Sequence, residues 1–261
     1  MLSTVRGTAV IGLGTIINVA TIVIGATLGI LIGNRLPERT TRVVTDALGL
    51  VTLVIGGLNV MALADADFTA AVGSGITLLI VLGALLIGGI AGSLLQIEQR
   101  LEGFGSWLQS RFSASGTTEG KARFISGFVD SSLVFCIGPL AILGALSDGT
   151  GHGIEQLALK STLDGFAALA FAASLGWGVA ASAIPVGLWQ GLLTVIAFWV
   201  GSVMSSAVIA SITATGGILL LGVGLRLLKI RQVAVGDLLP ALVVAPLLTL
   251  LVISLQPLFS A

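Results

Sequence analysis

Two oppositely charged residues lie within an otherwise apolar stretch, residues 157–176, which reads LALKSTLDGFAALAFAASLG. Lys160 and Asp164 are four positions apart, so in a helix they share one face and can form an ion pair. A charged side chain at the centre of a bilayer costs about 2.5–3.5 kcal/mol on insertion scales, and such residues often mark ion or substrate pathways. This pair is therefore the first candidate for an ion- or substrate-binding site.

Polar residues also interrupt two other apolar segments. Asp130 and Ser131 lie in SGFVDSSLVF, and Asn18 lies in the first apolar segment. At about 1.5 Å per helical residue, Asp130 is expected roughly 9 Å in from one membrane face and Asp164 roughly 10 Å in from the other. Carboxylates on both sides of the midplane suit a polar pathway, so we expect Asp130, Ser131, Asp164, Lys160 and Asn18 to bind a substrate or ion.

Structural roles for these residues stay open at this point. Asp130 could be shallow enough to reach headgroup water, and Lys160 could extend its ammonium to the outer surface. Asp164 would then be a structural partner of Lys160. Asn18 could form a hydrogen bond between helices without any part in binding.

Composition places these residues in a membrane protein. Hydrophobic residues make up 56% of the 261 residues and charged residues only 9%, whereas soluble domains carry about 25% charged residues. Crossing the hydrocarbon core takes about 20 apolar residues. The sequence predicts an all-α, polytopic transmembrane helix bundle in a single domain, 1–261, with about eight spans: 10–33, 43–64, 72–95, 124–146, 157–177, 180–203, 207–228 and 236–256.

Ten basic residues at or after the ends of the first, third and seventh spans predict the orientation. With eight spans these ten fall on one side, which the positive-inside rule makes cytoplasmic; they are Arg35, Arg39, Arg42, Arg100, Arg111, Lys121, Arg123, Arg226, Lys229 and Arg231. Both termini are then outside, with Asp148, His152 and Glu155. The first apolar run continues to about Gly33, too long for a signal-peptide core, so we expect it to remain as a span.

The long connection after the third span has a pattern of its own. Residues 97–112, IEQRLEGFGSWLQSRF, place apolar side chains at helical spacing, which predicts an amphipathic helix lying in the cytoplasmic interface. Packing of this helix on neighbouring loops is an equal alternative. Residues 113–121, SASGTTEGK, are expected to form a flexible loop.

The first and last thirds of the chain share a spacing of small residues. Spans 1–3 would start outside and spans 6–8 inside, so a repeat between them would be inverted, as in many secondary transporters. The matched positions are Ile22, Gly25 and Gly29 with Ile184, Gly187 and Gly191, and Gly49, Gly57 and Leu58 with Gly216, Gly224 and Leu225. With 36 glycines in the chain, chance matches are an alternative explanation.

Glycine and proline also predict how helices pack and break. Gly25, Gly29 and Gly33 form a small-xxx-small pattern for close helix contact, within the chain or in a homo-oligomer. Gly138–Pro139 would interrupt the fourth span and free backbone carbonyls, which could coordinate a cation or merely shape packing.

Signatures of enzymes are missing from the sequence. It has no G-x-x-x-x-G-K-[ST] loop, H-E-x-x-H or G-x-S-x-G motif. Cys136 is the single cysteine of the sequence, so it has no partner for an intramolecular disulfide. The 12 basic and 12 acidic residues balance, so the net charge gives no sign of nucleic-acid binding. His152 near Asp148 and Glu155 favours a solvated loop over a metal site. We therefore expect no enzyme, cofactor or metal.

Three segments together resemble the YdfK/YqgA-like family of bacterial membrane proteins: GTIINVATIVIGATLGILIGNRLPER, FVDSSLVFCIGPLAILGALSDG and KSTLDGFAALAFAASLG. The resemblance extends over nearly the whole chain. It implies a multi-pass protein of the bacterial cytoplasmic membrane, and it implies no activity.

The residues favour a secondary transporter or exporter of a small solute or ion, coupled to H⁺ or Na⁺. Two alternatives from other classes remain, a glycine-lined oligomeric channel and a non-transporting scaffold or regulator that acts through residues 97–123. The expected partners are the lipid bilayer and the solute or ion, with a homo-oligomer as a further option.

Overall fold

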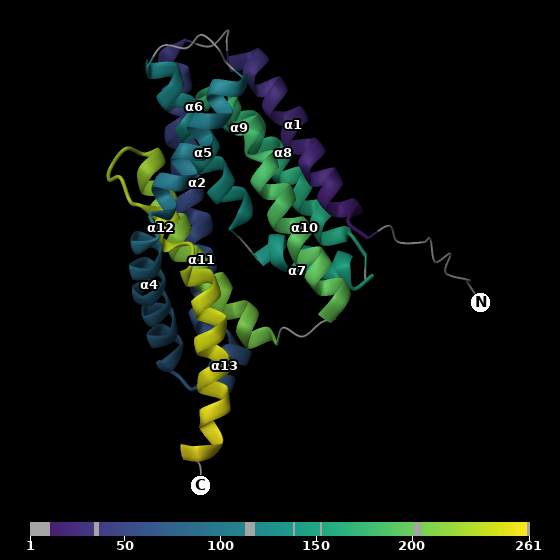
Figure 1. Cartoon of the computed structure of the whole chain (residues 1–261), viewed down its shortest axis with the longest axis vertical. Coiled ribbons are helices and arrows are strands. Elements are labelled where there is room, and N and C mark those ends of the chain that lie inside the picture. The colour runs from purple at the N-terminus through teal and green to yellow at the C-terminus, as the bar shows by residue number, and fades with distance from the viewer. Residues whose placement is uncertain are drawn as a thin grey trace, which may run out of the picture.

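The computed structural model describes residues 11–33, 37–112, 118–137, 139–151, 153–200 and 205–259. Regular structure in these ranges is entirely helical, and Figure 1 shows the helices gathered into one elongated bundle. The elements are α1 (Leu13–Gly33), α2 (Glu38–Val60), η1 (Met61–Ala64), α3 (Ala66–Val72), α4 (Ile76–Leu94), α5 (Ile97–Phe112), α6 (Thr118–Cys136), α7 (Pro139–Gly149), α8 (Glu155–Leu175), α9 (Gly178–Ala181), α10 (Ala183–Val200), α11 (Ser206–Leu227), α12 (Val235–Leu238) and α13 (Ala241–Phe259).

Most of the apolar segments predicted from the sequence are helices that could cross a membrane. Within the described ranges, six stretches are long and apolar enough: Leu13–Gly33, Arg42–Ala64, Ile76–Leu94, Gly178–Trp199, Ser206–Leu227 and Val235–Gln256. The bent pair α6 and α7 adds a seventh if it is counted as one span. The segment predicted near 157–177 is the helix α8, which Glu155, Lys160 and Asp164 make more polar than the other six. The structure thus shows six or seven helices that could span a membrane, and the count of eight stays a prediction.

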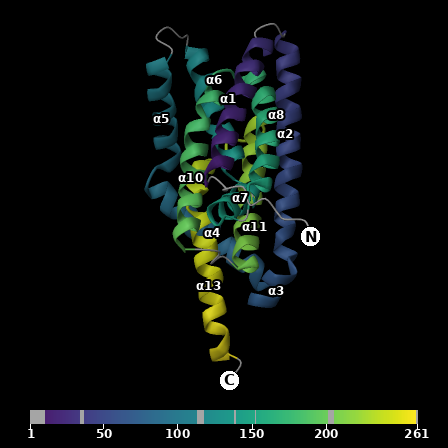
Figure 2. The ribbon, with the colours of Figure 1, turned by 90° about the vertical axis from the view of Figure 1, so that its right-hand side faces the viewer.

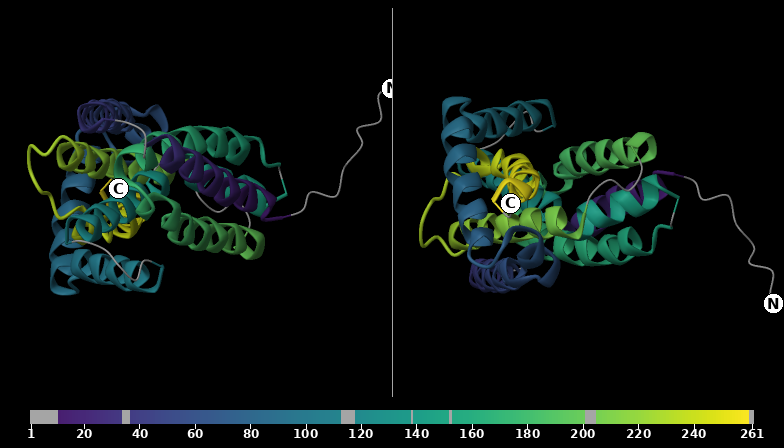
Figure 3. Two further views of the ribbon diagram at one scale, coloured as in Figure 1. Left: turned by 90° about the horizontal axis from the view of Figure 1, so that it is seen from above. Right: turned by 90° about the horizontal axis from the view of Figure 1, so that it is seen from below.

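Apart from α5, the helices form two groups that pack against each other. The α1 group consists of α1, α6, α7, α8, α9 and α10, and the α11 group consists of α2, η1, α3, α4, α11, α12 and α13; most helix contacts lie within a group. In Figure 1 α4 and α13 diverge from α7 and α10 toward the lower part of the view. Figure 2 shows α1, α2, α8 and α10 following the long axis, and in the end-on views of Figure 3 α1, α8 and α10 lie together on one side.

The fourth predicted span is interrupted as the sequence indicates. Helix α6 ends at Cys136 and α7 begins at Pro139, and the two helices are bent by 61°. Proline has no backbone N–H and a fixed φ, so it suits the first position of a new helix. Gly138 lies outside the described residues. The predicted break therefore separates two helices of different direction.

Helices α8 and α10 are distinct rather than one broken span. Helix α8 ends at Leu175 and is capped by Gly176, which has a φ of +78°, a conformation that glycine adopts without strain. The chain then reverses through α9 into α10 (Figure 1).

Glycines of α1 place its backbone directly against α8. A Cβ atom at Gly25, Gly29 or Gly33 would collide with the carbonyl oxygen of Gly165, Leu169 or Ala173 respectively. The constant separation of 140 residues in these three pairs shows that α1 and α8 run parallel and in register. Close approach of this kind is what small-xxx-small patterns provide, so these glycines pack within the chain.

Two local features differ from the sequence prediction. The connection between α2 and α4 contains η1 and α3, and Asp65 caps α3 by accepting a hydrogen bond from the Phe68 amide at 3.0 Å. Helix α6 begins at Thr118, within the predicted loop, and Glu119 in its first turn favours a helix start. The other part of that loop, 113–117, lies outside the described residues, as do Arg35 and His152.

Helix α5 confirms the amphipathic helix predicted at 97–112. It packs on α6 through the buried Leu108 and through Phe104, whose ring lies 5.8 Å from the ring of Phe128. Trp107 beside them is 56% exposed. The helix thus uses one edge for packing and leaves an aromatic edge uncovered.

The close contact between α1 and α8 predicts a steric difference between two glycines. Gly29→Ala should lower the free energy of unfolding by about 1–3 kcal/mol, because the added methyl group would overpack the Leu169 carbonyl. Gly191→Ala is the matched control, since nothing lies within 4 Å of its Cβ position; it should be neutral or stabilising by up to about 1 kcal/mol. Thermal unfolding in detergent checks both, and equal stability of the two variants would contradict the packing.

Candidate functional site

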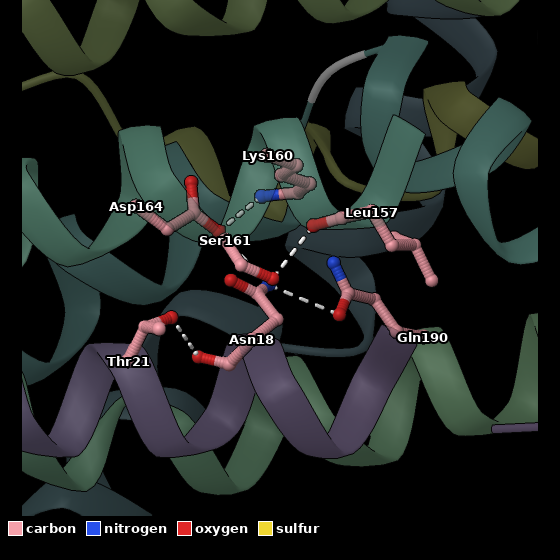
Figure 4. A network of polar contacts seen from close by, with 7 residues as sticks. All are labelled: Asn18, Thr21, Leu157, Lys160, Ser161, Asp164 and Gln190. Atoms are coloured by element: carbon pink, nitrogen blue, oxygen red, sulfur yellow. Dashed lines mark hydrogen bonds and ion pairs between the residues drawn. The ribbon is translucent and has the colours of Figure 1, made fainter. Parts of the chain in front are cut away.

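Helix packing brings four polar side chains together inside the α1 group. We name Asn18, Lys160, Asp164 and Gln190 the α8 cluster; they come from α1, α8 and α10 (Figure 4). Their exposed fractions are 0%, 6%, 8% and 0%. The register of α1 on α8 positions Asn18 beside Asp164, and the sequence-predicted residues Asn18, Lys160 and Asp164 thereby meet at one place.

Asp164 is the centre of this cluster. Its Oδ2 atom accepts a hydrogen bond from Asn18 Nδ2 at 3.0 Å and forms an ion pair with Lys160 Nζ. Asn18 Nδ2 also donates to Gln190 Oε1 at 3.1 Å. Figure 4 shows the Asn18 side chain lying between Asp164 and Gln190. The Asn18 amide nitrogen thus joins α1 both to α8 and to α10.

Burial of Lys160 excludes one of its structural alternatives. Its ammonium group turns inward to Asp164 and its side chain is 7% exposed, so it does not extend to the surface. The pair is neutral when both groups are ionised. Because a buried pair of this kind is often no more stable than apolar residues of the same size, its presence is weak evidence for a stabilising role.

A pocket of about 370 Å³ lies against this pair. Lys160 and Asp164 form part of its wall, and Thr52 and Asn59 add polar groups from α2. The other lining residues are apolar and come from α2, α6, α7, α8, α11 and the break before α7. Among the described residues that line this pocket, only Lys160 and Asp164 are therefore ionisable.

A second pocket, of about 330 Å³, lies on the other side of the break. It is lined by apolar residues of α6, α7, α10, α11 and α13, with Trp189 and Thr213 among them. Ile137 lines both pockets. The break between α6 and α7 thus separates a charged pocket from an apolar one.

Asp130 belongs to a separate network, about two turns before α6 ends at Cys136. Its Oδ1 atom lies 3.2 Å from Arg226 Nε, and Arg226 also pairs with Glu98. Glu98 accepts a hydrogen bond from the Gly236 amide at 2.5 Å, and its own amide donates to Asp237 at 2.9 Å. We name Glu98, Asp130 and Arg226 the Arg226 network; it ties α5, α6, α11 and α12 together.

Asp130 and Ser131 therefore have different surroundings from those expected. Asp130 is 5% exposed and paired, so it does not reach headgroup water. Ser131 is fully buried, and its hydroxyl has no hydrogen-bond partner among the described residues. No described hydrogen bond or ion pair joins Asp130 to the α8 cluster. Of the five predicted residues, three thus lie in the α8 cluster, whereas Asp130 and Ser131 lie apart from it.

Sequence reasoning missed three residues of these networks. Gln190 is a lone amide in an apolar helix, so the signal that singles out Asn18 applies to it as well. Arg226 and Glu98 were assigned to the cytoplasmic side and to the amphipathic helix, and their pairing across 128 residues has no local signature. Asp148, expected in an outer loop, is 2% exposed.

Asp148 holds the start of α1 in place. Its carboxylate accepts hydrogen bonds from the Gly12 amide at 3.1 Å and the Gly14 amide at 3.2 Å. Free amides at a helix start favour a negative charge. Asp148 therefore acts as a cap supplied by α7.

Comparison with known proteins places the chain in a family. The model of the family described as "Protein of unknown function (DUF554)" matches residues 13–250. The chain belongs to this family. This confirms the resemblance found in the sequence, because the two members named there are relatives of the chain.

Two relatives are similar over most of their length. "Uncharacterized protein YqgA" of Escherichia coli (strain K12) is 32% identical over 233 residues, 89% of this chain and 94% of the relative. "Uncharacterized membrane protein YdfK" of Bacillus subtilis (strain 168) is 28% identical over 235 residues, 89% of this chain and 93% of the relative. No solved structure matches the chain. Together with the apolar helices, the family identifies a membrane protein.

The Arg226 network predicts a large loss of stability on removal of its cation. Arg226→Ala leaves the carboxylates of Asp130 and Glu98 without their cation, which should cost about 3–5 kcal/mol. Arg231→Ala is the control, because Arg231 is exposed. Thermal unfolding of the purified variants checks this, and equal melting temperatures would show that the network contributes nothing to the fold.

Proposed function

We propose that the protein is a secondary transporter or exporter of a small solute or ion, coupled to H⁺ or Na⁺. The observation that carries the proposal is the α8 cluster on the wall of the 370 Å³ pocket. A carboxylate there can take up a proton or cation, and the adjacent ammonium can respond to that change. The site is built for binding rather than for enzymatic chemistry, which fits the missing enzyme motifs.

Energetics support a role beyond stability. Each charge would cost about 2.5–3.5 kcal/mol in the centre of a membrane helix. Pairing Lys160 with Asp164 offsets part of that cost, yet apolar residues of similar volume would avoid it entirely and often stabilise by about 1–4 kcal/mol. A function in which one partner changes its charge state would explain why a neutral pair lies beside the pocket.

The two helix groups supply a means of alternating access. Both pockets lie where the α1 group faces the α11 group. The groups are bridged by the Asp130–Arg226 ion pair and by a hydrogen bond between Thr45 and Ser174. Rocking of one group against the other would open that bridged end and close the pockets, as in transporters built from helix bundles.

The same contacts support eight spans and an inverted repeat. Counting the α6–α7 pair and α8 as spans gives eight. The repeat equates α1 with α10, α2 with α11, and α4 with α13, and each of these three pairs is in contact. A two-fold axis in the membrane plane would relate the members of each pair. The repeat then contributes its first helices to the α1 group and its others to the α11 group.

The proposed orientation places the bridged end in the cytoplasm of a bacterium. Arg123 donates to the Ser174 carbonyl there at 2.8 Å, and Arg226 lies in its network at the same end of the bundle. The positive-inside rule makes this the cytoplasmic end in a bacterial inner membrane. Asp148 and the start of α1 then mark the outer end.

The glycine-lined channel is less well supported. Gly25, Gly29 and Gly33 lie against the backbone of α8, and Gly56 and Gly217 lie against each other's helices. Glycines used in this way are not available to line a pore.

Orientation can be tested with single cysteines in a Cys136→Ser background. Cysteines at Glu38 and Lys229 should resist an impermeant thiol reagent in intact cells, because both positions are cytoplasmic in this scheme. A cysteine at Thr150 should react. Labelling of the first two positions from outside would overturn the orientation.

The site itself is tested by two substitutions in the ion pair. Asp164→Asn keeps the shape and removes the charge, so solute-dependent flux in liposomes should fall to background while the protein still folds and inserts. Lys160→Ala should change the pH or cation dependence of that flux. A dye for internal pH, with panels of small anions, cations and neutral solutes, provides the assay.

Stability measured on the same samples separates function from structure. A structural pair loses stability when one partner is removed, whereas flux per folded molecule stays the same. Normal flux per molecule in a destabilised Asp164→Asn protein would contradict the proposed site. Thr215→Val, a buried substitution away from the pocket, serves as the control for nonspecific effects.

A further inference from the structure

Four buried polar atoms between α1 and α10 have no hydrogen-bond partner among the described residues. They are Thr15 Oγ1, Asn18 Oδ1, Gln190 Nε2 and Thr194 Oγ1, on side chains that are 8%, 0%, 0% and 2% exposed. Other buried hydroxyls, such as those of Ser161 and Thr215, donate to a carbonyl of their own helix. Since buried polar groups are nearly always satisfied, these four atoms point to a ligand.

The four side chains form one row along the helix interface. Asn18 and Gln190 are joined across it at 3.1 Å. Thr15 lies one turn before Asn18, and Thr194 lies one turn after Gln190. Because α1 and α10 run in opposite directions (Figure 1), both threonines lie on the same side of the Asn18–Gln190 pair. We name these four residues the α1–α10 row.

The row leads from the outer end of the bundle to Asp164. The end of α7 touches both helices at the threonine end: Asp148 accepts from the Gly14 amide, and the Cβ position of Gly149 meets the Thr194 carbonyl. At the other end Asn18 donates to Asp164. The row thus spans the interval between the outer surface and the buried carboxylate.

Asp164 also determines which side-chain amide atoms of Asn18 and Gln190 have no hydrogen-bond partner. An ionised carboxylate only accepts hydrogen bonds, so Asn18 must turn its Nδ2 toward Asp164 and its Oδ1 away. Gln190 must then present Oε1 to Asn18 Nδ2, which leaves its Nε2 free. The row therefore offers an acceptor, a donor and two hydroxyls that can act as either.

Water is the ligand that satisfies this mixed set. A metal cation would be held by the oxygens and repelled by the Gln190 N–H₂ group, and an anion would be repelled by Asn18 Oδ1. A buried water makes about 2–4 hydrogen bonds and needs both kinds of partner. A file of waters can also pass protons from one molecule to the next.

We infer that the α1–α10 row holds a water file that delivers protons from the outer face to Asp164, so the coupling ion is H⁺. The use of that proton for transport rests on the proposed function, but the path itself does not. The carboxylate takes the proton from the file, while Lys160 keeps its own. The pair changes from neutral to a single positive charge on the pocket wall, which favours a negatively charged solute.

Few other charges lie on the helices around Asp164, and α8 itself carries one besides Lys160, Glu155 in its first turn. Helices α1, α9 and α10 carry none in their described lengths. The remaining helices packed on α8 are α2, α6 and α7. Their charged residues are Glu38, Arg39, Arg42 and Asp46 on α2, Glu119, Lys121, Arg123 and Asp130 on α6, and Asp148 on α7, which is held by amides of α1.

Infrared difference spectroscopy after a pH jump tests the path without any solute. The full chain in lipid nanodiscs is stepped to lower pH, and the C=O band of protonated Asp164 is identified by its loss in Asp164→Asn. Thr15→Val combined with Thr194→Val removes both hydroxyls at nearly constant volume. The band should then appear about tenfold more slowly or worse, since waters in the file would lack their 2–4 partners.

Two control variants show whether a slower protonation of Asp164 is due to the loss of the Thr15 and Thr194 hydroxyls. Thr215→Val removes a buried hydroxyl that is already bonded within α11 and should leave the rate unchanged. Thr15→Ser with Thr194→Ser keeps the hydroxyls and should protonate at the parent rate even if the valine variant misfolds. A parent rate in the folded valine variant, slow protonation in the serine variant, or no Asp164 band at any pH would overturn the inference. Normal titration in a protein that moves no solute would support the path and count against transport alone.

Discussion

The ion pair between Lys160 and Asp164 is the interaction around which the α1 group is organised. Neither charge is tolerable alone in an apolar helix, and the pair still needs a third group to satisfy the carboxylate. That group is Asn18, and it can reach Asp164 only because the glycines of α1 allow the two backbones to touch. The amide of Gln190 then adds α10 to the same point. The close packing of the α1 glycines on α8 thus allows the buried polar contacts to form.

A pocket and a row of unpartnered polar atoms border this arrangement. The carboxylate and ammonium face the pocket, on the side of α2 and α11, and the unpartnered amide and hydroxyl atoms lie between α1 and α10. The break at Pro139 lies beside the pocket and changes the direction of the chain by 61°. At the opposite end, Arg226 binds Asp130 and Glu98 and holds the two helix groups together. The two groups are thus joined by an ion pair and a hydrogen bond at one place and have pockets between them at another.

Local patterns predicted the features that depend on neighbouring residues. The i, i+4 spacing of Lys160 and Asp164 predicts their pairing, the glycine ladder of α1 predicts a close helix contact, and Gly138–Pro139 predicts the break. Long-range partners were beyond such patterns. Gln190 is 172 residues from Asn18, and Arg226 is 128 residues from Glu98. The prediction that Asp130 and Asp164 lie on one pathway rests on their expected depth in the membrane alone. In the structure Asp130 pairs with Arg226 and Asp164 bonds to Asn18, so the two carboxylates belong to separate networks.

The central claim is that the charged pair is kept for what it does in the pocket rather than for stability. Replacing both partners at once, Lys160→Met with Asp164→Leu, tests it most directly, because no charge is left stranded. Thermal unfolding and solute-dependent proton flux are measured on the same reconstituted protein. The account predicts stability equal to or above that of the parent, by as much as about 1–4 kcal/mol, together with loss of flux. A stable double variant that carries flux at the parent rate would contradict it.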